Sequence, residues 1–432
     1  MGKMAGRVSK RRTLLMLAVG AALAAAPRAM AQADRSGNQS ATLNRLIEEG
    51  LAHNPRVVAA RAHWEALRRG PLQERTLPDP QVQLQEFTVG SPKPSAGYET
   101  SNFYYTGVGV EQDIPGPGKL RLRGAIAAQD AEVARHQWEA AQRAAAEKIR
   151  ESYCELFYLT RTMGLLQSER RELEGIAAIA EARYRVGEGQ AADVLKAQLQ
   201  ATAMLNEIAH HRREMAQRQA ELKAALGRDV DGPDVAIGEL EPTRVALVEG
   251  DLGAAVSERS TAVQMERAAE ARSETALRLA RRGYLPDFTL GYAYQKTGVG
   301  QPDYFMLTVG ARIPLYFWRR QTPAVEQAAL ELEAARAEVR ADELDEGAAA
   351  ADELVAIRAA DRILRIYEQG LLPQAESALQ TALAAYRASR VDFQTLLAAF
   401  NERLNLREED YRELADREIA VARLEQTIGE LP

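Results

Sequence analysis

The sequence predicts a mainly α-helical protein with a small transmembrane β part, in which long antiparallel helices are joined to two pairs of strands. Three observations predict this class. Charged residues make up 27% and aromatic residues only 6% of the 432 residues, which is typical of long helices and coiled coils. Two pairs of segments alternate apolar and polar residues with the period of a strand. The chain also repeats its motifs after about 200 residues.

The N-terminus has the features of a secretory signal. A basic region that includes Arg11 and Arg12 is followed by an apolar run of about 14 residues, too short to span a bilayer comfortably. The small residues of Ala29-Met30-Ala31 then form a cleavage site. Residues 1–31 are therefore expected to be a signal peptide, exported by the general or the twin-arginine route.

The net charge, the single cysteine and the lack of long apolar segments exclude several classes of partner and structure. Without the six basic residues of the signal, 49 basic and 61 acidic residues remain, a net charge of −12. This charge argues against a nucleic-acid partner. The single cysteine, Cys154, has no internal disulfide partner. No later segment has the roughly 18 consecutive apolar residues of a membrane helix, so no helical membrane span is expected.

Three pairs of echoed segments, in the same order, indicate a duplicated unit. The pairs are "LPDPQVQL" with "LPDFTLGY", "VGVEQDIP" with "VGARIP", and "YRVGEGQAADVL" with "YRASRVDFQTLL". The sequence therefore predicts a first repeat over residues 32–228 and a second over 251–432. Residues 229–250, rich in Gly, Pro and acids, are the expected linker.

Each repeat contains one pair of expected strands. These lie at about 80–89 and 102–114 in the first repeat, and at about 287–296 and 304–314 in the second. Their length of about ten residues and their alternation suit a transmembrane barrel, and two half-buried soluble hairpins are the alternative. Four strands cannot close a membrane barrel, so several chains must share one.

Prolines mark the places where strands are expected to meet helices. Proline lacks an N–H and fixes φ, so it ends a helix or begins a strand. These junction prolines are Pro78, Pro80, Pro115, Pro117, Pro286 and Pro314.

Each repeat also contains a long helical hairpin. The helical pattern from residue 119 to about 185 would be on the order of 100 Å long and must pack along a neighbour. Gly187 and Gly189 then place a turn at about 186–190, before a return helix. The second hairpin turns at about 387–392, and Pro373 should kink or break its first helix. Because the second turn has Ser389 and Val391 where the first has glycines, a different shape is expected there.

No catalytic, cofactor or metal site is expected, so the chain is not predicted to be an enzyme. The segment "GEGQAADV" lacks the Lys-Ser/Thr of a phosphate-binding loop, and neither H-E-x-x-H nor C-x-x-C occurs. His210 and His211 are adjacent and point to different sides of a helix. An acidic cluster at 338–346 is interpreted as a solvated helix face, with the lining of a tunnel as the alternative. Residues 318–320, Trp-Arg-Arg, fit a membrane-interface anchor or packing against a neighbouring helix.

The combined motifs resemble the TolC family of outer-membrane efflux channels over nearly all of the mature chain. They are "HNPRVVAARA", "LPDP", "DIPGPGKLRLRG", "RYRVGEGQAADVLKAQ", "LLPQAESAL" and "AYRASRVDFQTLLAAFNERL". The resemblance implies a homotrimer in the outer membrane of a Gram-negative bacterium, with a large periplasmic part. Each chain would give four strands to a twelve-stranded barrel in outer-membrane lipid, and the helices would form a coiled-coil barrel with residues 229–250 at its equator. The implied partners are a periplasmic adaptor (a membrane fusion protein) and an inner-membrane pump of the resistance-nodulation-division class.

The segment "IPGPGKLRLRG" most resembles the branch that serves heavy-metal cation pumps, the CzcC/CusC-like branch. Export of drugs or organic solutes, or type I secretion, are the alternatives within the family. A soluble periplasmic coiled-coil scaffold is the alternative outside it.

The resemblance also implies roles at the two turns. Family channels close through an Asp of the first hairpin and a Tyr and an Arg of the second, and Asp193 and Tyr386 correspond by position. Val391 stands at the family's arginine position, with Arg390 one residue earlier, so these three polar residues are the gate candidates. The candidates for contact with the adaptor are Tyr184, Gly187, Gly189 and Ser389.

Overall fold

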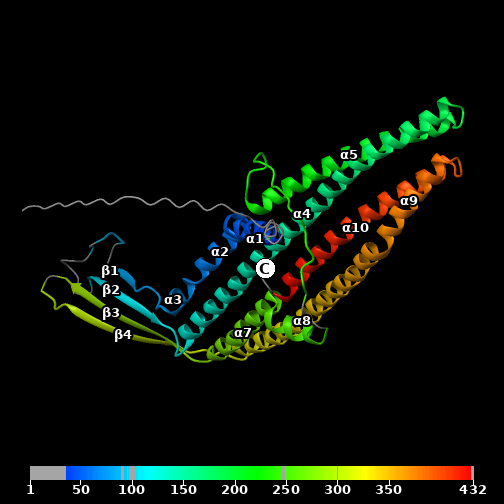
Figure 1. The fold of residues 1–432 in the computed structure, drawn as a ribbon. Helices are drawn as coiled ribbons and strands as arrows, with labels where there is room; N and C mark the ends of the chain where they lie inside the picture. The colour runs from blue at the N-terminus through cyan, green and yellow to red at the C-terminus, as the bar shows by residue number, and fades with distance from the viewer. Residues whose placement is uncertain are drawn as a thin grey trace, which may run out of the picture.

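The protein is elongated, with a sheet at one end and two helical hairpins reaching away from it (Figure 1). The computed structural model describes residues 36–88, 92–94, 96, 104–245, 249–298 and 300–429, with side chains from residue 43 onwards. The predicted mainly helical class with four antiparallel strands is confirmed. The expected signal peptide lies outside the described residues.

The sheet is built from both repeats. It contains β1 (Gln81–Phe87), β2 (Tyr105–Ile114), β3 (Asp287–Thr297) and β4 (Tyr304–Arg312), in the order β1-β2-β3-β4. All three pairings are antiparallel, and β2 pairs with β3 along ten residues although they are far apart in sequence. Strands β1 and β4 are the two edges, each paired on one side only.

The register collects apolar side chains on one face of the sheet. Val82 lies opposite Val110, Val110 opposite Tyr292, and Tyr292 opposite Leu307. The next row along the strands has Leu84, Val108, Tyr294 and Phe305. This face is open, since Leu84 is 88% exposed and Leu307 68% exposed.

The opposite face of the sheet carries mainly polar and small residues, since successive residues of a strand point to opposite sides and the sequence alternates. Gln83 donates to Glu111 at 3.2 Å, and Gln295 donates to Gln85 at 3.4 Å. Gly109, Ala293 and Met306 lie in the same row.

The helices of the first repeat lie beyond one end of the strands (Figure 1). Helices α1 (Ser36–His53), α2 (Pro55–Leu67) and α3 (Gly70–Arg75) lead to β1. Helix α4 (Lys119–Arg185) follows β2, and its 67 residues span about 100 Å. Helix α5 (Ala191–Leu226) returns antiparallel along it and ends at Gly227 in the left-handed region.

The second repeat has the same order of elements, with fewer residues before its first strand and with a π-helical turn that interrupts its long helix. A 3₁₀ turn (Glu249–Asp251), α6 (Leu252–Arg259) and α7 (Thr261–Arg282) precede β3. Helix α8 (Gln321–Ile366) passes through a π-helical turn (Tyr367–Leu371) into α9 (Leu372–Arg387), and α10 (Phe393–Ile428) returns. Pro373 lies in the first turn of α9, where its missing N–H leaves a gap in the helical ladder. The N–H of Leu372 accordingly bonds Tyr367 O, one residue further back than in an α-helix.

The two hairpins share one apolar core toward their turns. Its fully buried members include Leu166 and Leu173 of α4, Met204 of α5, Leu379 of α9 and Phe400 of α10. The core draws on four helices, so each hairpin depends on the other for burial of its apolar face.

Residues 229–245 lie across the helices and are held by side chains. The Gln219 amide bonds both the N–H and the C=O of Val235, at 2.9 and 2.8 Å. Glu418 accepts from the N–H and hydroxyl of Thr243, and Tyr153 accepts from the N–H of Gly238. This segment, rich in Gly, Pro and acids, is therefore held in one conformation because side chains of three helices form hydrogen bonds with its backbone N–H and C=O groups.

None of the described helices is long and apolar enough to cross a membrane.

Candidate functional site

The first turn of the hairpins closes by a helix C-cap. Glu188 N donates to Arg183 O at 2.9 Å, five residues back, and Gly187 lies in the left-handed region with φ 76°. A Cβ on Gly189 would lie 3.0 Å from Tyr184 N, so the second glycine allows a close backbone approach. Both glycines are therefore explained by the geometry of the turn.

The second turn closes in the same way. Arg390 N donates to Ala385 O at 2.8 Å, and Ser389 takes the left-handed position with φ 59°. The expectation that Ser389 and Val391 would give this part of the turn a different shape is wrong. The bonds that close the turn join backbone groups, so a serine can form them, although its side chain makes the left-handed backbone conformation less favourable than it is for glycine.

The structure brings two of the three gate candidates together. The Tyr386 hydroxyl of α9 donates to Asp193 Oδ2 of α5 at 3.3 Å, which joins the second hairpin to the first. Tyr386 is 2% exposed, and its ring packs edge-on against Phe393 with 5.6 Å between centroids. Burial and the nearby Asp193 charge both raise the pKa of Tyr386, so its hydroxyl stays a donor at neutral pH.

The other residues predicted at the turns lie nearby without joining this contact. Arg390 is exposed and bonds no side chain among the described residues, while Tyr184 is 51% exposed. Gly187, Gly189 and Ser389 lie in the turns themselves.

Sequence reasoning missed Arg183, whose guanidinium contacts both turns. Its Nη2 donates to Ser389 Oγ at 2.7 Å, and its guanidinium carbon lies 4.6 Å from the centre of the Tyr386 ring. The only signal in the sequence is its place directly before the echoed Tyr184, in a helix that contains many arginines.

A second polar cluster lies where the sheet meets the helices. Lys119 Nζ, at the start of α4, donates to Asp287 Oδ1 at 2.7 Å and to Leu285 O at 2.9 Å. Gly116 N donates to the same Asp287 oxygen at 2.7 Å, and a Cβ on Gly116 would lie 2.6 Å from Pro286 O. The two motifs "GPGK" and "LPD" therefore meet here and tie the second repeat's strand to the first repeat's helix.

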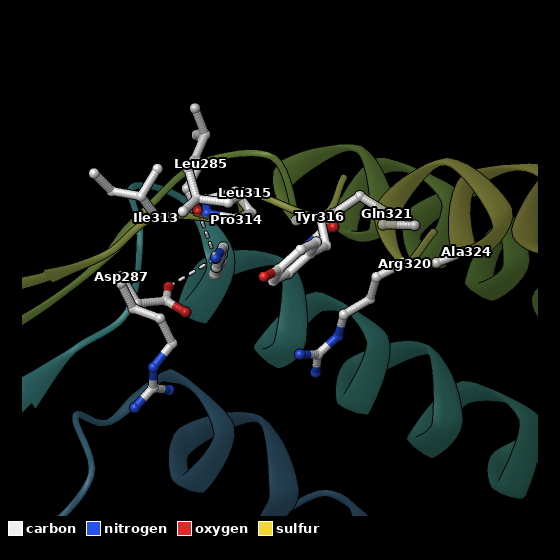
Figure 2. Close-up of a pocket in the computed structure, with 13 residues that line it drawn as sticks. Leu285, Asp287, Ile313, Pro314, Leu315, Tyr316, Arg320, Gln321 and Ala324 are labelled. Carbon is white, nitrogen blue, oxygen red and sulfur yellow. Dashed lines mark hydrogen bonds and ion pairs between the residues drawn. The ribbon is translucent and has the colours of Figure 1, made fainter. Parts of the chain in front are cut away.

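The cluster opens into a pocket of about 430 Å³. Figure 2 shows Asp287 at one side of this pocket and Arg320 at the other, with the Tyr316 ring between them in this view. The lining of the pocket combines one acid, Asp287, with the basic residues Lys119, Arg312 and Arg320 and several apolar side chains.

All six junction prolines lie beside strand ends. Two precede β1, two follow β2, one precedes β3 and one follows β4. They are Pro78, Pro80, Pro115, Pro117, Pro286 and Pro314. Each lies where a ladder N–H is not needed.

Replacing Lys119 with Met is expected to lower stability by about 2 kcal/mol, because Asp287 then loses its charged donor at a partly buried site. The measurement is the thermal melting of the purified protein in detergent. Arg121→Met is the matched control, since Arg121 is exposed and no bond of its side chain occurs among the described residues. Equal melting shifts in the two variants would show that the Lys119 contact contributes nothing specific.

The sequence predicts no metal-binding or catalytic group. The described residues include no group of three or more His, Cys, Asp or Glu side chains placed to hold a metal ion. Burial raises the pKa of the Cys154 thiol, which keeps it protonated and unreactive.

Comparison with known proteins identifies close fold relatives. The family model described as outer membrane efflux protein matches residues 46–228 and 253–430. No curated protein sequence matches the chain significantly. The outer membrane protein VceC from Vibrio cholerae superposes with TM-score 0.77 at 20% identity, covering 90% of this chain and 96% of its own.

Two further solved structures have the same fold. CusC has TM-score 0.80 at 15% identity, with 90% of this chain and 92% of CusC covered. The open state of the MtrE outer membrane channel of Neisseria gonorrhoeae has TM-score 0.75 at 16% identity, with 90% and 89% covered. At these identities the likeness establishes the fold.

Proposed function

The chain belongs to the outer membrane efflux protein family and is an outer-membrane protein, and we propose that it is the exit duct of a tripartite efflux system. In this role it receives substrates from an inner-membrane pump and a periplasmic adaptor and conducts them passively to the exterior.

The apolar face of the sheet is the observation that carries this proposal. Two successive rows of that face are Val82-Val110-Tyr292-Leu307 and Leu84-Val108-Tyr294-Phe305. In both rows the cross-strand neighbours are apolar in all four strands and are mostly exposed, whereas the other face carries mainly Gln, Glu, Thr and Gly. This is the pattern of a wall with lipid on one side and water on the other.

The edge strands β1 and β4 explain why the duct would be an oligomer. Their free backbone groups cannot face lipid, so β4 of one copy must pair with β1 of the next. We propose a homotrimer, since three chains of four strands close a barrel of twelve. Residues 32–228 and 251–432 would then be two copies of one unit, joined at the equator by residues 229–250.

The turns would form the periplasmic end of the duct. We propose that Asp193 and Tyr386 hold this end closed, with exposed Arg390 reaching an acidic group of a neighbouring copy. Tyr184, Gly187, Gly189 and Ser389 would then meet the adaptor, because they lie at the turns and all but the half-buried Gly189 are exposed.

The proposed cargo is heavy-metal cations. The support is the resemblance of "IPGPGKLRLRG" to the metal branch, together with the excess of acidic residues, which favours cations over anions in a water-filled path. Efflux of drugs or organic solutes is the second candidate.

Deletion of the gene is expected to sensitise the cell to Zn, Co, Cd, Cu or Ni more than to a panel of drugs. The measurement is the minimal inhibitory concentration for each compound, with the plasmid-borne gene as control. Sensitivity to drugs alone would reject the metal assignment and leave the duct in place.

Separation of the cell into outer-membrane and periplasmic fractions distinguishes the proposed duct from a soluble periplasmic scaffold. We expect the protein in the outer-membrane fraction, extracted only by detergent and with the mass of a trimer. Recovery from the periplasm without detergent would reject the duct.

A further inference from the structure

One arginine side chain touches both turns of the protein. Arg183 lies in the last turn of α4, and its Nη2 donates to Glu188 O of its own turn at 3.1 Å. The same nitrogen donates to Ser389 Oγ of the other turn at 2.7 Å, and Nη1 donates to Tyr386 O. A single guanidinium therefore connects the two hairpins, which are also joined near the turns by the Tyr386–Asp193 bond and by a bond from Lys196 Nζ to Gln394 Oε1 at 3.2 Å.

The residue that receives this bond has a strained backbone. Ser389 is the only residue other than glycine with positive φ in the part of the chain that the structure describes. At the matching place of the first turn, Gly187 takes the same conformation without a side-chain penalty. A serine there costs about 1 kcal/mol, and the Arg183 bond to its hydroxyl adds to the turn's own backbone bonds in favouring this conformation.

Arg183 also sets the position of the Tyr386 ring. Its guanidinium lies over one face of the ring, 4.6 Å from the centroid, while Phe393 packs against the ring edge-on. Arg183 Nε is buried and has no hydrogen-bond partner, so its two terminal nitrogens make every polar contact of the side chain. The planar guanidinium suits this geometry, and a lysine ammonium cannot reproduce it.

We propose that Arg183 is a positioning residue of the periplasmic gate, which fastens the second turn to the first and orients Tyr386 toward Asp193. This inference rests on the proposed duct function and adds to it a residue that stabilises the closed state. When the Arg183 contacts break, Ser389 loses the bond that favours its strained backbone, and the second hairpin is free to separate from the first.

The first test is the single-channel conductance of the purified full-length protein in planar bilayers. Arg183→Met is expected to raise the conductance severalfold over wild type. Arg183→Lys is expected to raise it as well, because lysine keeps the positive charge but lacks the two terminal nitrogens of the planar guanidinium. Arg185→Met is the matched control, since the Arg185 side chain is 69% exposed and, among the residues that the structure describes, pairs only with Glu181 of its own helix. It is expected to conduct as wild type does.

The second test reads the turns directly. Spin labels at the exposed positions of Glu188 and Arg387 report the distance between the two turns by electron paramagnetic resonance. We expect this distance to lengthen and broaden in Arg183→Met and to stay unchanged in Arg185→Met. This readout does not depend on conduction.

Two serine variants keep the proposal testable if Arg183→Met does not fold. Ser389→Ala removes the hydroxyl and keeps the strain, so it is expected to open the turn, whereas Ser389→Gly removes both and should open it less. Wild-type conductance and label distance in both Arg183→Met and Ser389→Ala would overturn the role of Arg183, even if a variant that lacks the Tyr386–Asp193 bond (Asp193→Ala with Tyr386→Phe) opens. Absence of any channel in the wild type would instead reject the proposed duct.

Discussion

Removing the Asp193 carboxylate and the Tyr386 hydroxyl together is expected to raise the single-channel conductance in planar bilayers severalfold. The two groups form a hydrogen bond of 3.3 Å between α5 and α9, so the variant Asp193→Ala with Tyr386→Phe removes both halves of one link between the hairpins. The phenyl ring of the variant keeps its packing on Phe393 and under Arg183, which limits the change to the polar contact.

Tyr184→Phe is the matched control for this experiment. Tyr184 lies near the same turn and is 51% exposed, and its hydroxyl bonds no other group among the described residues. Its conductance is expected to equal that of the wild type. An unchanged conductance in the double variant would remove Asp193 and Tyr386 from the gate.

Local patterns were enough to predict the four strands and the two long helical hairpins. The alternation in residues such as Phe305, Leu307 and Val309 marks a strand wherever it lies, because it reflects only which side chains share a face. The repeat of "LPD" and of the "YR" turns likewise placed corresponding elements at corresponding positions.

The contacts that join the repeats could not be predicted in this way. Lys119 and Asp287 are 168 residues apart, and Arg183 and Ser389 are 206 apart, so no local pattern relates them. One signal was available and was misread. Ser389 stands where the duplication places Gly187, and the shared capping bonds indicate a shared backbone despite the different side chain.

The burial of individual charged residues could not be predicted from the sequence either. Arg403 lies in the segment "NERLNLREED", where every charged residue is compatible with a solvated helix face. Only the packing of α4 and α9 against α10 makes its position an interior one.

Replacing Arg403 with Met is expected to destabilise the protein by about 3–5 kcal/mol, because it leaves the buried Glu169 carboxylate without its main partner. The Arg403 side chain is 4% exposed and donates to Glu169, which is 2% exposed, and to Glu172 at 2.6 Å. Its other terminal nitrogen donates to Glu376 of α9 at 3.1 Å. One guanidinium thus joins α4, α9 and α10, and without it the half-exposed Arg407 would still pair with Glu169 and Glu376.

Denaturant unfolding followed by circular dichroism in detergent measures this effect. Arg412→Met is the matched control, because Arg412 also joins α10 to α4 through Glu155 but is 44% exposed, and it should cost about 1 kcal/mol or less. Adding Glu169→Gln to Arg403→Met should recover part of the loss, since it removes the buried charge that causes most of the penalty. If Arg403→Met costs no more than Arg412→Met, or Glu169→Gln worsens it, then packing rather than ion pairing holds the two hairpins together at this level.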